Sequence, residues 1–133
     1  MKLRFLNRSH SQRETFIIKQ NRFPHFLKIW HYHSELELVV IQESVGTRFV
    51  GDSIQKFEPN DVVLIGKNLP HMWLNDDAYF ENNSNLIAEA ISIHFEENFL
   101  GDDFFKAPEM SAILGLLEKT KYGIKFININ KNE

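Results

Sequence analysis

The sequence has no cysteine, which excludes disulfide bonds and thiolate metal ligands. It has no apolar run near the roughly 18 residues that a membrane-spanning helix needs, and residues 1–8 lack the apolar core of a signal peptide. The net charge of −3, from 15 basic and 18 acidic residues, argues against nucleic-acid binding by this segment. Nucleophile motifs and glycine-rich phosphate loops are also missing, which argues against covalent catalysis and nucleotide chemistry. We therefore expect a cytoplasmic protein with no membrane partner.

The chain is long enough for one domain with a sizeable core, because it has 133 residues of which 43% are hydrophobic. Between about residue 14 and residue 95, short apolar runs are separated by turn residues such as Gly51-Asp52. This pattern predicts about eight strands, over residues 15–18, 26–33, 36–42, 47–50, 53–57, 62–66, 71–74 and 88–95. Short strands joined by hairpin turns are typical of an all-β sandwich or small barrel.

The final third changes period. Residues 96–105 predict one short helix interrupted by Gly101, and Pro108-Glu109 begins a second helix. The second helix carries an apolar stripe with the spacing i, i+3, i+4 and i+7, formed by Met110, Ile113, Leu114 and Leu117. The stripe must be buried, either on the protein's own sheet or in a dimer interface. We expect a β-barrel over residues 1–95, helices over 96–126 and a solvated tail over 127–133.

Polar residues capable of binding a ligand gather around residues 31–37 and 71. His31 and His33 share one face of an extended strand, Glu37 follows four residues later, and His71 comes directly after a proline. Three imidazoles and a carboxylate can form the ligand shell of a divalent transition metal such as zinc, nickel, manganese or iron. Without metal, the same cluster would line a polar pocket for a small ligand.

A straight strand through this region is difficult to reconcile with the hydrophobic pattern. It would place Leu36 and Leu38 on the face opposite to His31 and His33. Either both faces of the strand are covered, or the chain bends at residues 34–35. Such a bend also decides which glutamate faces inward, and the spacing favours Glu37 over Glu35.

Two further side chains are candidates for the same pocket. Trp73 lies two residues after His71 and is either a pocket wall or a core residue. His94 shares a strand face with Ser92, and that polar face either lines the cavity or faces solvent. We expect His25 to be a surface residue.

The arrangement of these residues resembles the two sequence motifs of the cupin superfamily. The matching positions are His31, His33 and Glu37 followed by Gly46, then Gly51, Pro59, Asp61, Pro70 and His71. The chain departs from the pattern in the longer spacing from Glu37 to Gly46, in Asp61 where many cupins have glycine, and in lacking the asparagine expected after His71. These departures, with segments 30–38, 51–54, 59–66 and 69–73 and the helix at 108–109, resemble the N-terminal sensing domain of AraC-type transcription regulators over about residues 14–126.

The resemblance implies a double-stranded β-helix, or jelly-roll, cupin barrel that binds a small effector. In that family, helix-turn-helix units after the barrel bind DNA, so this chain would be an excised sensor domain or a stand-alone cupin that does not bind DNA directly. The expected effector contacts are His31, His33, Glu37, His71, Trp73 and His94. The helical stripe suits the dimer interface that such sensors commonly form, or docking on the barrel.

Two functions from different classes follow. The favoured one is a non-catalytic sensing domain for a small effector, with a preference for a polar or anionic one. The alternative is a metal-dependent cupin enzyme, an oxygenase or isomerase, in which His31, His33, Glu37 and His71 hold the metal. The sequence offers the enzyme no separate acid or base beyond those ligands.

Overall fold

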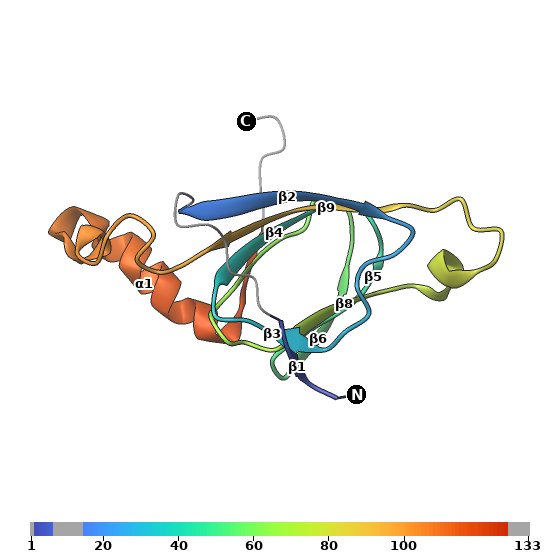
Figure 1. Cartoon of the computed structure of the whole chain (residues 1–133), viewed down its shortest axis with the longest axis horizontal. Coiled ribbons are helices and arrows are strands. Elements are labelled where there is room, and N and C mark those ends of the chain that lie inside the picture. The colour runs from blue at the N-terminus through green and yellow to red at the C-terminus, as the bar shows by residue number, and fades with distance from the viewer. Residues whose placement is uncertain (1, 7–14, 128–133) are drawn as a thin grey trace.

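Ten strands form two five-stranded sheets in the part of the chain that the computed structural model describes, residues 2–6 and 15–127 (Figure 1). Sheet A has the strand order β1 (Arg4–Phe5), β3 (His31–Tyr32), β8 (His71–Asn75), β5 (Gly46–Val50) and β6 (Ser53–Phe57). Sheet B has the order β10 (Ile124–Phe126), β7 (Val62–Ile65), β4 (Leu36–Glu43), β9 (Ala88–Phe95) and β2 (Phe16–Phe23). Neighbouring strands are antiparallel, except that β1 pairs with β3 in parallel. The expected all-β class is confirmed, although the described strands form two separate sheets rather than one hydrogen-bonded barrel.

The core lies between the two sheets, because both present apolar side chains to the interior. In β9 the even-numbered residues 88–94 are buried, while the odd-numbered residues are half-buried on the outer face. Phe57, Ile41 and Ile65 are almost completely buried and belong to one cluster of contacting core residues. The inward side chains of Ala90 and Ser92 in β9 are small and leave space between the sheets. This space is the cavity described below.

Most of the predicted strands appear within two residues of their expected ends. The predicted hairpin turn at Gly51-Asp52 is also present and joins β5 to β6. Gly51 adopts the left-handed φ of +57° that this turn requires. The predicted strand over 26–33 is wrong, because only residues 31–32 pair in a sheet. The backbone N–H of Phe26 donates instead to the side chain of Asn75, 2.7 Å away. Residues 24–30 therefore form a loop beside the opening of the sheets.

The first strand of sheet B is longer than expected. The prediction covered residues 15–18, whereas β2 continues to Phe23 and pairs with β9 along its whole length. Residues 19–22 are all polar, so the apolar pattern that identifies strands stops at Ile18. β2 is an edge strand of sheet B and buries little of either face. This explains why its sequence shows little hydrophobic alternation.

The C-terminal region has one α-helix, α1 (Ser111–Lys119), in the described residues. Short 3₁₀ turns occur at η1 (Asp77–Phe80), η2 (Phe104–Lys106), η3 (Pro108–Met110) and η4 (Thr120–Tyr122). The helix expected over 96–105 is wrong, since only turns and η2 occur there. None of the described helices has the length and apolar character to cross a bilayer.

Helix α1 contacts the outer face of sheet B near one end (Figure 1). Its Leu117 is buried against Leu36 and Leu64, and strand β10 then returns to pair with β7. Ile113, on the same predicted stripe, is 44% exposed, while Met110 and Leu114 are half-buried. One end of the apolar stripe, at Leu117, therefore packs on sheet B, whereas Ile113 is exposed to solvent.

Candidate functional site

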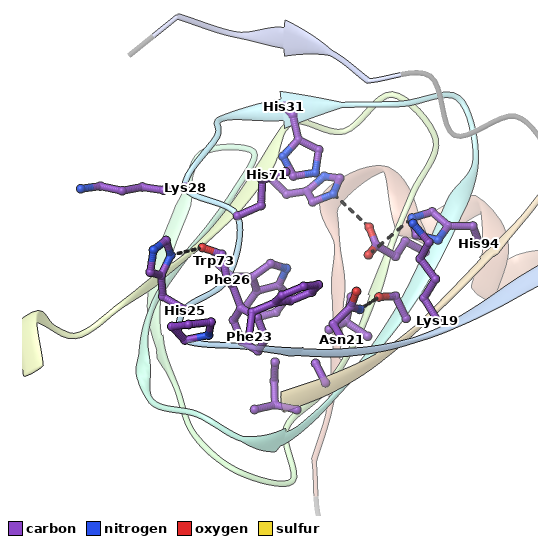
Figure 2. Close-up of a pocket in the computed structure, with 17 residues that line it drawn as sticks. Lys19, Asn21, Phe23, His25, Phe26, Lys28, His31, His71, Trp73 and His94 are labelled. Carbon is purple, nitrogen blue, oxygen red and sulfur yellow. Dashed lines mark hydrogen bonds and ion pairs between the residues drawn. The ribbon is translucent and has the colours of Figure 1, made fainter. Parts of the chain in front are cut away.

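A cavity of about 500 Å³ opens between the sheets (Figure 2). Its walls come from β2, β4 and β9 of sheet B, from β3 and β8 of sheet A, and from the loop over residues 24–30. The lining residues are Lys19, Asn21, Phe23, Pro24, His25, Phe26, Leu27, Lys28, His31, Glu37, Val39, Ile41, His71, Trp73, Ala90, Ser92 and His94. The size is within the usual range for pockets that bind small molecules.

The cavity has a polar end and an apolar end, because sheet B presents a different residue type at each rung. Three pairs of neighbouring residues on β4 and β9 face the cavity. In order along the sheet they are Glu37 with His94, Val39 with Ser92, and Ile41 with Ala90, so the pairs become less polar in that direction. On the opposite wall, His71 and Trp73 follow the same direction along β8. A ligand in the cavity would therefore meet imidazoles at one end and apolar side chains at the other.

Glu37 lies at the centre of the imidazole cluster. Its Oε2 is 3.1 Å from Nε2 of His33 and 3.0 Å from Nε2 of His71. Its Oε1 is 3.6 Å from Nε2 of His94. The ring of His31 contacts that of His71, with 4.3 Å between the ring centroids. All five side chains are buried.

The cluster depends on two local features of the chain. Strand β3 ends after Tyr32 and the chain bends at residues 34–35, so that β4 begins with Glu37 facing the cavity. The hydrophobic pattern left two alternatives, and both hold: the chain bends, and Leu36 on the outer face is buried against α1. Glu37, which the spacing favoured, is the inward glutamate. The second feature is the register of β3 and β8, which pairs His31 directly with His71.

Backbone carbonyls determine how three of the rings are oriented. Nδ1 of His31 is 2.7 Å from the carbonyl oxygen of Ile29, and Nδ1 of His71 is 2.7 Å from that of Leu69. Nδ1 of His33 is 3.0 Å from the carbonyl oxygen of Glu35. A carbonyl only accepts, so Nδ1 carries the hydrogen in each ring and Nε2 of the neutral ring keeps its lone pair. This is the tautomer in which a histidine binds metal through Nε2.

Burial and neighbouring charges perturb two groups of the cluster. Burial alone would raise the pKa of Glu37, but hydrogen bonds from His33 and His71 outweigh it and hold this pKa well below its usual value. Burial, with the charge of His71 as the second cause, lowers the pKa of His31 from 6.5 to about 4. At neutral pH the site therefore combines an anionic Glu37 with a neutral His31.

The cluster fits a divalent metal ion. Two sets of three residues bring their donor atoms within 4.8 Å of one another: His31, His33 and His71, and His33, Glu37 and His94. Two donors on one ion, each about 2.1 Å from it, are about 3.0 Å apart at octahedral angles and about 3.4 Å apart at tetrahedral angles. Glu37 Oε2 is 3.1 and 3.0 Å from its two Nε2 neighbours, close to the octahedral spacing. An imidazole donating both to a carbonyl and to Glu37 needs two ring protons, and a cation at Nε2 removes that need. The expected set His31, His33, Glu37 and His71 is thus brought together, with His94 beside it.

A five-residue turn over 66–70 connects the cluster with the end of α1. The N–H of Asn68 donates to the carbonyl of His33 over 2.7 Å, and the carbonyl of Leu69 holds the His71 ring. At the other end of the turn, the N–H of Gly66 donates to the carbonyl of Thr120 over 3.1 Å. A Cβ at Gly66 would overlap that carbonyl. Residue 66 must therefore be glycine for the turn to lie this close to η4.

The remaining predicted residues lie as follows. Trp73 is buried and lines the cavity, whereas His33 contacts Glu37 from behind the cavity wall. His94 and Ser92 both face the cavity. His25, which was expected at the surface, is half-buried and lies at the cavity rim, where its ring contacts Phe80. Lys19 and Asn21 also line the cavity and were not predicted, because their only signal is the alternation that β2 continues beyond Ile18.

No protein-family model matches the chain, and no curated protein matches its sequence. Solved structures do match. A cupin 2 conserved barrel domain protein from Salinispora arenicola is 14% identical with a TM-score of 0.50, over 71% of this chain and 75% of that one. ToxT from Vibrio cholerae, an AraC-type regulator, is 16% identical with a TM-score of 0.51. A second ToxT structure, bound to (E)-4-(8-methylnaphthalen-1-yl)but-3-enoic acid, has a TM-score of 0.50 at the same identity.

Both ToxT matches cover 90% of this chain but only 44% of the ToxT chain. At these identities the similarity defines the fold. The chain has a cupin fold that resembles the N-terminal sensing domain of AraC-type regulators, and the predicted jelly-roll class is confirmed.

Proposed function

We propose that this domain is the cytoplasmic, non-catalytic sensor of a small-molecule effector in an AraC-type transcription regulator. The observation that carries the proposal is the cavity of about 500 Å³, graded from imidazoles to apolar side chains, within a fold similar to that of ToxT. An effector that binds two arrangements of the domain with different affinity shifts the population between them. DNA contacts belong, in this proposal, to a domain outside this chain.

The protonation of the cluster supports sensing over acid–base catalysis. An efficient general base has a pKa near the working pH, whereas the pKa of Glu37 is held far below neutrality and that of His31 is about 4. Both oxygens of Glu37 already face imidazoles. Glu37 is therefore suited to hold the rings or a cation in place, and poorly suited to accept a substrate proton.

Tryptophan fluorescence provides a direct test of cavity binding. The chain has two tryptophans, so Trp30→Phe leaves Trp73 in the cavity wall as the sole reporter. The probe is the naphthalenyl butenoic acid seen with ToxT, and we expect a saturable change in Trp73 emission. Ala90→Leu narrows the cavity and should weaken binding at least tenfold. Ile91→Leu, on the outer face of the same strand, is the matched control and should leave it unchanged. Equal binding by the two variants would contradict the proposal.

A metal-dependent oxygenase or isomerase is the second candidate, favoured by the convergence of the Nε2 atoms of His33, His71 and His94 on the Glu37 carboxylate. His31, His33, Glu37 and His71 would hold zinc, nickel, manganese or iron, and His94 lies within reach of the same ion. Such an ion supplies Lewis acidity to a bound substrate.

Elemental analysis of untagged protein separates the two candidates. Two results together would favour the enzyme over the sensor. The protein would bind nearly one equivalent of metal that His71→Ala loses, and it would turn over a candidate substrate. A metal bound without turnover agrees with a sensor that keeps the site. The control is His25→Ala, which removes an imidazole at the cavity rim, away from His94 (Figure 2), and this variant should retain the metal.

We further propose a homodimer formed through the exposed part of the α1 stripe. Ile113 is open to solvent and Met110 and Leu114 are half-buried, while Leu117 is occupied by the sheet. Light scattering after size exclusion should give twice the chain mass for the wild type and a monomer for Ile113→Glu. A wild-type monomer at high concentration would contradict the dimer without affecting the sensor proposal.

A further inference from the structure

Exposed apolar side chains gather where sheet B meets α1. Figure 1 places the beginning of β2 at the same end of the molecule as α1. Ring contacts connect the two elements, because Phe99 lies 6.4 Å from Phe16 of β2 and 6.0 Å from Phe105 between ring centroids, and Phe105 packs in the cluster that contains Leu117 of α1. We define the β2–α1 patch by four residues that are between 43% and 60% exposed: Phe16, Ile18, Phe104 and Ile113.

The outer face of sheet B has the composition of a covered surface. An antiparallel sheet that faces water usually directs polar residues outward, yet β9 directs Ile91 and Ile93 outward and β2 directs Ile18 outward. Helix α1 covers one end of this face through Leu117. Ile18, on the outermost strand, remains 60% exposed. Contiguous apolar surface of this kind indicates an interaction site.

The α1 stripe alone is too small for the homodimer proposed above. A stable interface buries about 800 Å² on each partner. Of the large apolar residues in this nine-residue helix, Ile113 is the exposed one, and Leu117 already packs on the chain's own sheet. A dimer that uses α1 must therefore extend over a neighbouring apolar surface, and the β2–α1 patch connects the helix to the outer face of β2.

The two halves of the patch carry opposite charge. From Glu96 to the end of α1 the chain has six acidic and two basic residues, whereas β2 has Lys19 and Arg22 and no acidic residue. Arg22 pairs with Glu89 over 3.5 Å, but its side chain is still 66% exposed. Two copies docked helix against helix would bring the acidic segments together, whereas a helix docked on β2 meets basic residues.

We propose that the partner of the β2–α1 patch is a second copy of this chain, docked so that Ile113 of each copy lies against Ile18 of the other. A twofold axis makes this contact occur twice, so both halves of the patch are covered in both copies. The inference rests on the proposed homodimer and adds its surface and arrangement: each helix packs on the partner's sheet and not on the partner's helix.

Lysine substitutions on the two sheets test the surface by sedimentation equilibrium. Ile18→Lys should raise the dimer dissociation constant by about tenfold or more, because the twofold axis places two lysines against apolar side chains. The matched control is Ile54→Lys on the outer face of sheet A, where the isoleucine is 66% exposed against 60% at residue 18. It should leave the constant unchanged. Both positions are exposed, so the circular dichroism spectra of the two variants should match that of the wild type.

A charge exchange tests the reciprocal contact. Ile18→Lys and Ile113→Glu should each be monomeric, and an equimolar mixture should form a heterodimer, which light scattering detects. One half of that interface is unchanged, and in the other half the introduced charges attract each other. A dimer that persists in Ile18→Lys, or a mixture that stays monomeric, overturns the inference while the dimer through α1 stands. A wild-type monomer overturns both and leaves the sensor proposal in place.

Discussion

The metal-free domain should lose stability as the pH falls from 7.5 to 4.5, and His31 should account for most of that loss. Its pKa is about 4 in the folded protein and about 6.5 in an exposed chain, because burial and the neighbouring His71 disfavour the charged ring. Below pH 6.5 the unfolded chain binds a proton that the folded protein does not. The free energy of unfolding therefore falls with decreasing pH until the folded ring also becomes protonated near pH 4.

The magnitude follows from the gap between the two pKa values. Each pKa unit is equivalent to about 1.4 kcal/mol, so the difference between 6.5 and about 4 corresponds to at most about 3.5 kcal/mol. Glu37 acts in a separate window. Its folded pKa is depressed, so its contribution is present above the unfolded pKa, about 4.3, and is lost only as the pH falls below that value. The interval from pH 7.5 to 4.5 thus isolates His31 from Glu37.

Urea unfolding of the wild type and His31→Gln, in EDTA at pH 7.5, 5.5 and 4.5, measures this contribution. We expect the wild type to lose about 2–3 kcal/mol more than the variant between the first and last pH. Parallel pH dependence in the two proteins would refute the argument, since it would mean that His31 binds its proton equally well in both states.

Three other substitutions test the packing around the site. Gly66→Ala should cost about 1–3 kcal/mol in urea unfolding, because its Cβ would overlap the Thr120 carbonyl. Gly115→Ala points into open space within α1 and should instead stabilise by about 0.5–1 kcal/mol, so a shared sign would contradict the close contact at residue 66. Leu64→Ala should cost about 2–5 kcal/mol, because Leu64 is buried between Leu36 and Leu117, and a loss below 1 kcal/mol would show that the interface repacks.

Local sequence patterns were sufficient where a residue's neighbours decide its environment. The two-residue spacing of His31 and His33 predicted that they share a site, and their rings do lie close together although β3 ends at Tyr32. The conflict with Leu36 and Leu38 offered the bend that turns Glu37 inward as one of two alternatives. The position of His94 stayed open, because its side of β9 becomes the inner side only through the pairing of β9 with β4. That pairing joins segments about fifty residues apart, and no local pattern specifies it.

Lys19 and the loop over 24–30 show where sequence patterns fail for a different reason. The strand β2 is held by backbone pairing at a sheet edge, so its polar residues carry no hydrophobic signal. Residues 26–30 have the composition of a strand, yet Asn75 captures the N–H of Phe26 and the segment stays a loop. In both places long-range hydrogen bonds override the local preference.

The turn over residues 66–70 is held at both ends: by hydrogen bonds to the His71 ring and the His33 carbonyl on one side, and to the carbonyl of Thr120, the residue directly after α1, on the other. Because five residues leave little slack, the rings cannot shift independently of the helix end without breaking a backbone hydrogen bond. The consequence is that a displacement of the His71 ring would be resisted at Thr120, so the turn joins the imidazole cluster to the C-terminal end of α1.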